Sequence, residues 1–326
     1  MPRIPDIDSL VNGILLGDRT SLSQGITLIE STLESHLEAS EQLLKALLPN
    51  TGNALRVAVT GAPGVGKSTF IEVLGTHLVD SGNRVAVLPI DPSSPQTGGS
   101  ILGDKTRMQR LAKHPNAFIR PSPSGANAGG VTHTTRSVMQ LCEAAGYNPI
   151  LIETVGAGQG DYAVREITDL VLLLVLAHAG DELQGIKRGI LETADLIAVT
   201  KADGEFKEKA FASAKVYRQA LSLYSNRLGI AKVLISSAHS NKGIAETWEA
   251  IRELEGVARS NGHFERQRQE QIKSAVLETA KILLLTHFGQ SVSVQDAVEK
   301  IQMQVMNGEC TIDHAANQLL DVFRES

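Results

Sequence analysis

The sequence has few cysteines, the residues that stabilise small secreted folds and bind structural zinc. Its 326 residues include two cysteines, Cys142 and Cys310, which are far apart and fall in neither a C-x-x-C nor a Cys/His ligand spacing. This spacing argues against a disulfide framework and against a structural zinc site. We therefore expect two reduced, buried thiols.

The sequence also lacks an excess of positive charge and a long apolar run. The formal net charge is -5 at pH 7, which gives no broad attraction to a nucleic acid backbone or an anionic bilayer. The longest apolar run, residues 170–177, is shorter than the about 20 residues that span a bilayer. The N-terminus shows no secretory signal pattern. We expect a cytoplasmic protein that binds neither nucleic acid nor membrane.

Short β-branched runs alternate with helical stretches through the middle of the chain. Such alternation is typical of βαβ units, in which helices cover both faces of a mostly parallel sheet. Because parallel strands are buried on both faces, they have nearly continuous apolar sequences. The predicted strands are residues 56–60, 84–90, 150–153, 170–176, 196–200 and 232–236.

Helical periodicity dominates the two ends of the chain. Residues 21–48 carry apolar side chains at helical spacing, and the segments 264–288 and 294–323 do so again, with breaks near Gly289 and at Asn307-Gly308. The apolar stripe of the last part would cover either the chain's own core or a second subunit, and the sequence leaves both open. We predict three parts: a helical N-terminal extension (1–52), an α/β domain (53–255) and a helical C-terminal arm (256–326).

The first predicted strand leads into a phosphate-binding motif. Residues 61–69, GAPGVGKST, fit G-x-x-x-x-G-K-[ST] in the strand–loop–helix context that the motif requires. Its glycines let consecutive N–H groups face a β-phosphate, and the following helix adds its positive end. We assign Lys67 to the β- and γ-phosphates and Ser68 to magnesium. The nucleotide-binding residues predicted here are Gly61, Ala62, Pro63, Gly64, Val65, Gly66, Lys67, Ser68 and Thr69.

Acidic residues end the second and third predicted strands. Ligands collect at the carboxyl ends of strands in such sheets, so we place Asp91 and Glu153 near the magnesium. The segment ETVG, residues 153–156, resembles the D-x-x-G switch of GTPases with glutamate in place of aspartate. That resemblance implies that Glu153 reaches the metal shell and that the Gly156 N–H meets the γ-phosphate.

A later segment predicts which base is bound. TKAD, residues 200–203, resembles the N/T-K-x-D element, in which Asp203 would accept the guanine N1 and N2 protons while Lys201 stacks on the base. Adenine has an acceptor at N1, and leaving a carboxylate against it would cost about 1–3 kcal/mol. GTP is therefore favoured over ATP. Thr200 stands where an asparagine usually ties this loop to the phosphate-binding loop. Ser236, Ser237 and Ala238 resemble the loop whose N–H meets guanine O6.

Four longer segments closely resemble the MeaB/ArgK family of P-loop GTPases. They are GDRTSLSQGITLIES (17–31), DPSSPQTGGSILGDKTRM (91–108), ETVGAGQGD (153–161) and AGDELQGIKRGILE (179–192). The resemblance spans nearly the whole chain and implies a three-layer α/β P-loop fold with helical extensions. It also implies a homodimer joined through the C-terminal arm. It further implies a chaperone that uses GTP to gate cofactor loading onto an adenosylcobalamin-dependent methylmalonyl-CoA mutase, or a relative, and to protect that mutase.

In addition to Lys67 and Glu153, further residues are assigned to GTP hydrolysis. We expect this hydrolysis to be slow and to be stimulated by a partner. Residues 91–107 form a plausible first switch, in which Asp104 would join the magnesium shell. Arg107 or Lys187 would neutralise charge on the transferred phosphoryl group. Gln159 would orient the attacking water, or is a solvent-facing polar residue.

Two other functions stay open at this point. A metallochaperone GTPase of the nickel-delivery type is disfavoured because the chain has no His-rich tail and no paired cysteines. A kinase or transport ATPase that acts on a small molecule such as arginine would have to tolerate ATP, and Asp203 argues against that tolerance.

Overall fold

A parallel seven-stranded sheet organises the chain in the computed structural model, which describes residues 6–31, 33–90, 108–120, 128–154, 164–177, 188–222 and 232–325. Its strand order is β3-β2-β4-β1-β5-β6-β7, and all neighbouring strands run parallel. The strands are β1 (Arg56–Gly61), β2 (Val85–Ile90), β3 (Ala117–Ile119), β4 (Ile150–Thr154), β5 (Leu170–Leu176), β6 (Leu196–Thr200) and β7 (Lys232–Ile235). The predicted α/β fold is confirmed.

All six strands predicted from β-branched runs are present, within one or two residues of the predicted ends. The sequence analysis missed β3, which has 3 residues and pairs with β2 at the edge of the sheet. A strand of that length offers no recognisable alternation, because a period of two needs several residues to appear.

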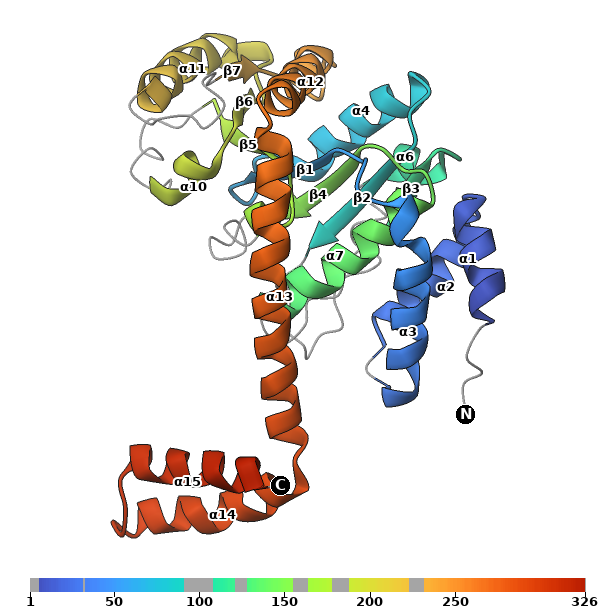
Figure 1. Cartoon of the computed structure of the whole chain (residues 1–326). Coiled ribbons are helices and arrows are strands. Elements are labelled where there is room, and N and C mark those ends of the chain that lie inside the picture. Colours follow the sequence, from blue (N-terminus) through green and yellow to red (C-terminus); the bar gives the residue numbers. More distant parts are fainter. Residues whose placement is uncertain are drawn as a thin grey trace. The chain divides into compact units, whose positions relative to one another are not determined.

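Helices cover both faces of the sheet (Figure 1). Successive residues of a strand point to opposite faces of the sheet. In β5, for example, Leu172 packs in one buried cluster and Val171 in another. The first face carries α4 (Lys67–Asp80), α6 (Gln109–Lys113) and α12 (Ile244–Ser260). The second face carries α1 (Ile7–Leu15), α2 (Arg19–Ile29), α3 (Glu34–Leu47), α7 (Ala128–Ala144), α10 (Arg188–Thr193) and α11 (Lys207–Ser222).

The predicted helical N-terminal segment consists of several helices. The stretch predicted from residue 21 to 48 is divided between α2 and α3, and α1 precedes them. Gly17 turns the chain between α1 and α2 with φ of 74°, a conformation that favours glycine. Asp18 then caps α2 by accepting the Ser21 N–H. Buried side chains from these helices pack with those of α7.

The chain divides into two compact units, residues 1–271 and 272–326. The predicted boundary at residue 256 falls inside α12, whereas this division lies within α13 (His263–Gln290). The second unit continues with α14 (Val292–Met306) and α15 (Ile312–Glu325), and these helices follow the predicted segments and their breaks. Phe288 and Phe323 stack edge to face in this unit, with ring centroids 5.3 Å apart.

Candidate nucleotide-binding site

The loop between β1 and α4 has the backbone that a phosphate-binding loop requires. Gly66, just before α4, has φ of 99°, and Gly64 has φ of 79°. At Gly61 the limit is space, because a Cβ atom there would lie 2.4 Å from the Leu174 carbonyl oxygen of β5. Since only glycine meets these conditions without strain, the spacing of glycines in the motif follows from the backbone path.

Lys67, the first residue of α4, brings a buried positive charge into this loop. Its ammonium donates to the carbonyl oxygens of Gly61 at 2.7 Å and Ala62 at 3.1 Å, and the residue is 8% exposed. The ammonium therefore lies against the loop and beside the N-terminus of a helix, where both the charge and the helix dipole favour an anion.

Ser68 and Glu153 meet at the edge of this loop, although they are far apart in the sequence. The Ser68 hydroxyl donates to Glu153 Oε1 at 2.6 Å. The pairing of β1 with β4 sets Val59 opposite Glu153, which brings the carboxylate to the end of β1. Hydroxyl and carboxylate oxygens are the kinds of ligand that Mg²⁺ takes in nucleotide sites. The donor set therefore fits the magnesium predicted here.

Thr200 ties the end of β6 to the phosphate-binding loop. Its buried hydroxyl lies 2.9 Å from the Val65 carbonyl oxygen and 3.2 Å from that of Val175 at the end of β5. Asparagine usually makes this tie, and here the threonine makes it. A hydroxyl has one proton for these two acceptors, whereas an asparagine amide has two.

The TKAD segment and the loop after β7 are joined by side-chain hydrogen bonds. Lys201, with φ of 55°, donates to the Gly64 carbonyl oxygen at 2.8 Å. The Ser237 hydroxyl donates to Asp203 Oδ1 at 2.8 Å and accepts the Ser240 N–H at 3.2 Å. The Asp203 carboxylate is thus oriented by Ser237 of the loop after β7. Lys201 connects the TKAD segment to the glycine-rich loop.

A family model described as "Methylmalonyl Co-A mutase-associated GTPase MeaB" matches residues 22–292. The chain belongs to the MeaB family. A probable GTPase of Mycobacterium tuberculosis is 46% identical over 318 residues, which cover 97% of this chain and 95% of that protein. The family resemblance predicted from the sequence is confirmed. As a MeaB-family protein, the chain is a GTP hydrolase and binds guanine nucleotides.

Other relatives are similar over most of their length. The mouse protein "Methylmalonic aciduria type A homolog, mitochondrial" is 41% identical, over 98% of this chain and 80% of that protein. GTPase ArgK of Escherichia coli is 45% identical, over 78% of each. A solved structure described as a LAO/AO transport system kinase is 32% identical and superposes with a TM-score of 0.74, over 98% of this chain and 97% of that one.

Several residues that the sequence analysis assigned to the MeaB-family site lie outside the described residues. Their roles stay predictions. They are Asp91, Asp104, Arg107, Gly156, Gln159 and Lys187. Among the described residues, no group of three or more His, Cys, Asp or Glu side chains could hold a metal ion. No described helix is both long and apolar enough to cross a bilayer.

The structure also brings together residues that the sequence analysis did not single out. The Thr154 hydroxyl donates to the Thr60 hydroxyl at 3.0 Å, which joins the ends of β4 and β1 just before the glycine-rich loop. Ser240 orients Ser237 through its backbone N–H. Both contacts depend on how distant segments line up, and no sequence motif carries that information.

Proposed function

We propose that this chain is a magnesium-dependent GTPase that regulates an adenosylcobalamin-dependent methylmalonyl-CoA mutase or a close relative. The observation that supports a nucleotide site most directly is the set of contacts around the glycine-rich loop. Lys67, Thr200 and Lys201 each donate to a carbonyl oxygen of residues 61–65. The groups proposed to bind phosphate and those proposed to bind guanine are therefore parts of one hydrogen-bonded assembly.

In this proposal the loop and Lys67 hold the phosphates, and Asp203 selects the base. The N–H groups of the loop and the N-terminus of α4 would stabilise the negative charge of the β-phosphate. Ser237 donates to Asp203 Oδ1 at 2.8 Å, and this hydrogen bond would orient the carboxylate toward the guanine N1 and N2 donors. Ser236, Ser237 and Ala238 would place a backbone N–H at guanine O6.

Magnesium would be held by Ser68, with Glu153 beside it. When bound, the ion would neutralise charge on the phosphate oxygens during transfer. Glu153 is 8% exposed, and its carboxylate accepts a hydrogen bond from the Ser68 hydroxyl, which fixes the orientation of that hydroxyl. We propose that Asp91 and Asp104 complete the metal shell and that Gly156 contacts the γ-phosphate. Arg107 or Lys187 would then neutralise developing charge, and Gln159 would orient water.

The partner is proposed from what the relatives are called. The family description names a methylmalonyl-CoA mutase-associated GTPase, and the mouse relative is named for methylmalonic aciduria. We propose that the GTP-bound and GDP-bound forms of this chain act differently on such a mutase, gating its cofactor loading and protecting it. Slow hydrolysis suits this role, because a regulator must persist in each state.

A homodimer formed through the second unit is part of the same proposal. That unit exposes large apolar side chains that a soluble helix would otherwise bury, a feature typical of protein interfaces. Seven of them are Ile272, Val276, Leu277, Leu283, Leu284, Leu285 and Met306, each at least half exposed. A second copy of this unit would cover them. Light scattering of purified protein should give the mass of a dimer, and a monomer at micromolar concentration would contradict it.

The experiment that tests the function measures GTP hydrolysis with and without the mutase. Hydrolysis should require Mg²⁺, stop on adding EDTA, and speed up when the cobalamin-loaded mutase is added. The variant Lys67→Ala serves as the control for contaminating phosphatases. A rate that the mutase does not change, in a protein that hydrolyses GTP, would contradict the regulatory role.

A further inference from the structure

The start of α13 carries a polar face directed at the amino ends of the strands, away from the glycine-rich loop. Phe264, Gln267, Arg268 and Gln271 are spaced i, i+3, i+4 and i+7, so they lie on one side of the helix. Phe264 and Gln271 are both buried. Glutamine and arginine are uncommon choices for a buried helix face, and burial of such groups requires that their hydrogen bonds be satisfied.

Arg268 binds the entry of β5 and the chain that leads into β1. It donates to both carboxylate oxygens of Asp169, at 2.9 and 2.7 Å, and to the carbonyl oxygens of Gly52 and Ala54. Arg56 donates to both oxygens of the same carboxylate, at 3.2 and 2.7 Å. Burial alone would raise the pKa of Asp169, but Arg268 and Arg56 outweigh it and hold that pKa below its ordinary value.

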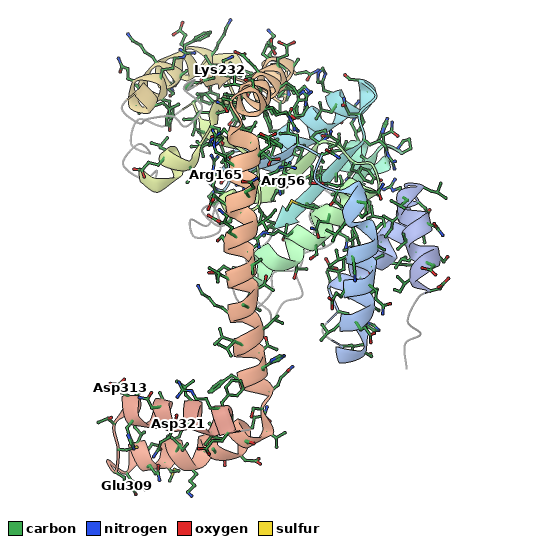
Figure 2. The ribbon with its side chains drawn as sticks, viewed as in Figure 1. Arg56, Arg165, Lys232, Glu309, Asp313 and Asp321 are labelled. Atoms are coloured by element: carbon green, nitrogen blue, oxygen red, sulfur yellow. The ribbon has the colours of Figure 1, made fainter. Side chains whose placement is uncertain are left out.

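Gln271 makes three hydrogen bonds in this contact. Its amide nitrogen donates to the carbonyl oxygens of Arg165 at 2.9 Å and Thr168 at 2.7 Å, and its amide oxygen accepts from Arg56 at 3.0 Å. In Figure 2, Arg56 and Arg165 are labelled on either side of α13. Gln267 adds a bond to the Thr168 carbonyl oxygen at 2.9 Å. Two carbonyl oxygens and a guanidinium would lose partners if Gln271 lost its amide.

The backbone that Gln271 holds is a turn with a particular place in the chain. Residues 164–169 contain the short helix η2 (Val164–Glu166), and the Thr168 hydroxyl closes the turn on the Val164 carbonyl oxygen at 2.9 Å. The turn directly follows residues 155–163, and these follow Glu153 and Thr154 of β4. One short segment thus connects the carboxylate beside Ser68 to the turn held by α13.

We propose that Gln271 is a positioning residue for the response to the γ-phosphate. Gln271 fixes the 164–169 turn, which directly follows residues 155–163 and hence Glu153 and Thr154. The affinity for GTP, but not for GDP, then depends on the hydrogen bonds that α13 makes to this turn. The inference rests on the proposed function, in which Gly156 contacts the γ-phosphate. It adds that α13 sets how strongly the two nucleotides are distinguished.

The variant Gln271→Leu tests this inference, because leucine nearly keeps the volume but donates no hydrogen bond. Affinities for GDP and for a non-hydrolysable GTP analogue are measured with fluorescent nucleotides. The affinity for the analogue should fall about fivefold or more, the usual size of coupling between sites, while the affinity for GDP stays within about twofold. Gln267→Leu, which removes the bonds of Gln267 to the Thr168 and Asp169 carbonyl oxygens of the same turn, should have a smaller effect of the same kind.

The matched control is Gln295→Leu, which removes a glutamine that donates to the Gly289 carbonyl oxygen at 2.8 Å within the second unit. It should change neither affinity. Equal weakening of both nucleotides by Gln271→Leu, or no weakening in a folded variant, would overturn the inference. A wild-type protein that the mutase does not stimulate would contradict the proposed function and leave this comparison of nucleotides intact.

Hydrogen exchange of the wild-type protein provides a test that needs no variant. Backbone amides of the 164–169 turn and of residues 263–275 should exchange more slowly with the GTP analogue than with GDP. With the analogue, the turn would be constrained both by α13 and by the proposed contact of Gly156 with the γ-phosphate. Identical exchange of these amides in the two nucleotide states would overturn the inference.

Discussion

The two ends of the sheet are held together in different ways. At the carboxyl end, single side chains such as Lys67 and Thr200 donate to main-chain carbonyl oxygens of a glycine-rich loop. At the amino end, Asp169 is paired with Arg56 and Arg268 in a buried ion network. The first arrangement keeps backbone groups positioned for a ligand, whereas the second holds segments of the chain to one another. We therefore expect substitutions of Lys67 or Thr200 to impair function, and substitution of Asp169 to impair stability.

Asp169→Asn should produce the largest effect. Removing the charge leaves two arginines that are each 14% exposed without their shared partner, and breaking a buried pair costs about 3–5 kcal/mol of unfolding free energy. Urea unfolding measures the loss. The control is Asp321→Asn, whose carboxylate pairs with Arg324 at 3.1 Å while 63% exposed, and which should change stability by about 0–1 kcal/mol.

The pH dependence of stability should also report on Asp169. The pKa of Asp169 is lower in the folded protein than its usual value, which is about 3.9 in an unfolded chain. A lowered pKa contributes stability above the unfolded value, and this contribution is lost as the pH falls through the folded value. The wild type should therefore lose more stability than Asp169→Asn below about pH 4. Parallel pH profiles would contradict the role of the ion network.

Lys67→Ala should abolish most GTP hydrolysis with little change in stability. Removing one positioned charge from a phosphoryl-transfer site costs about 100- to 1,000-fold in rate. Phosphate release assays measure the rate, and thermal unfolding checks the fold. Lys281→Ala removes an exposed lysine paired with Glu278 in the second unit and should leave hydrolysis unchanged. A Lys67→Ala protein that keeps the wild-type rate would show that the loop is not the catalytic phosphate site.

Asp203→Asn should weaken guanine nucleotides without weakening phosphate contacts. The loss expected for leaving a base donor without its acceptor is about 1–3 kcal/mol. Xanthosine diphosphate, whose C2 oxygen accepts a proton where guanine has an amino donor, should bind the variant better than it binds the wild type. Calorimetry measures the affinities of both proteins for GDP and for xanthosine diphosphate. Unchanged GDP binding would remove Asp203 from the base site.

Thr200→Val should have the smallest effect, a rise in the rate of GDP release. Valine keeps the shape but leaves the Val65 carbonyl oxygen without its donor, for a cost of about 1 kcal/mol or roughly fivefold. Thr200→Asn, with two amide protons, should restore or slow release. Thr247→Val, which removes a similar hydroxyl bond to the Gly243 carbonyl oxygen in α12, is the control. Equal release from Thr200→Val and wild type would contradict the tie.

The local backbone around the glycine-rich loop and the TKAD segment could be predicted from contiguous residues, because each motif directly follows a strand, β1 or β6. The binding roles of these residues stay predictions. The pairs Thr60–Thr154 and Asp203–Ser237 depend on strand register and on loops from different strands, which spacing does not reveal. Gln271 lay in a helix whose apolar periodicity was noted, but its buried polar face was not predicted, because only its contacts distinguish it from a solvated face.

In the proposed function, nucleotide binding depends on the phosphate-binding loop and on the Asp203 carboxylate, which selects guanine. Calorimetric titration of the purified chain in magnesium, comparing GDP with ADP, tests it directly. GDP should bind at least about fivefold more tightly than ADP, since mispairing at Asp203 costs about 1–3 kcal/mol. Equal affinity for the two nucleotides, or no binding of either, would contradict it.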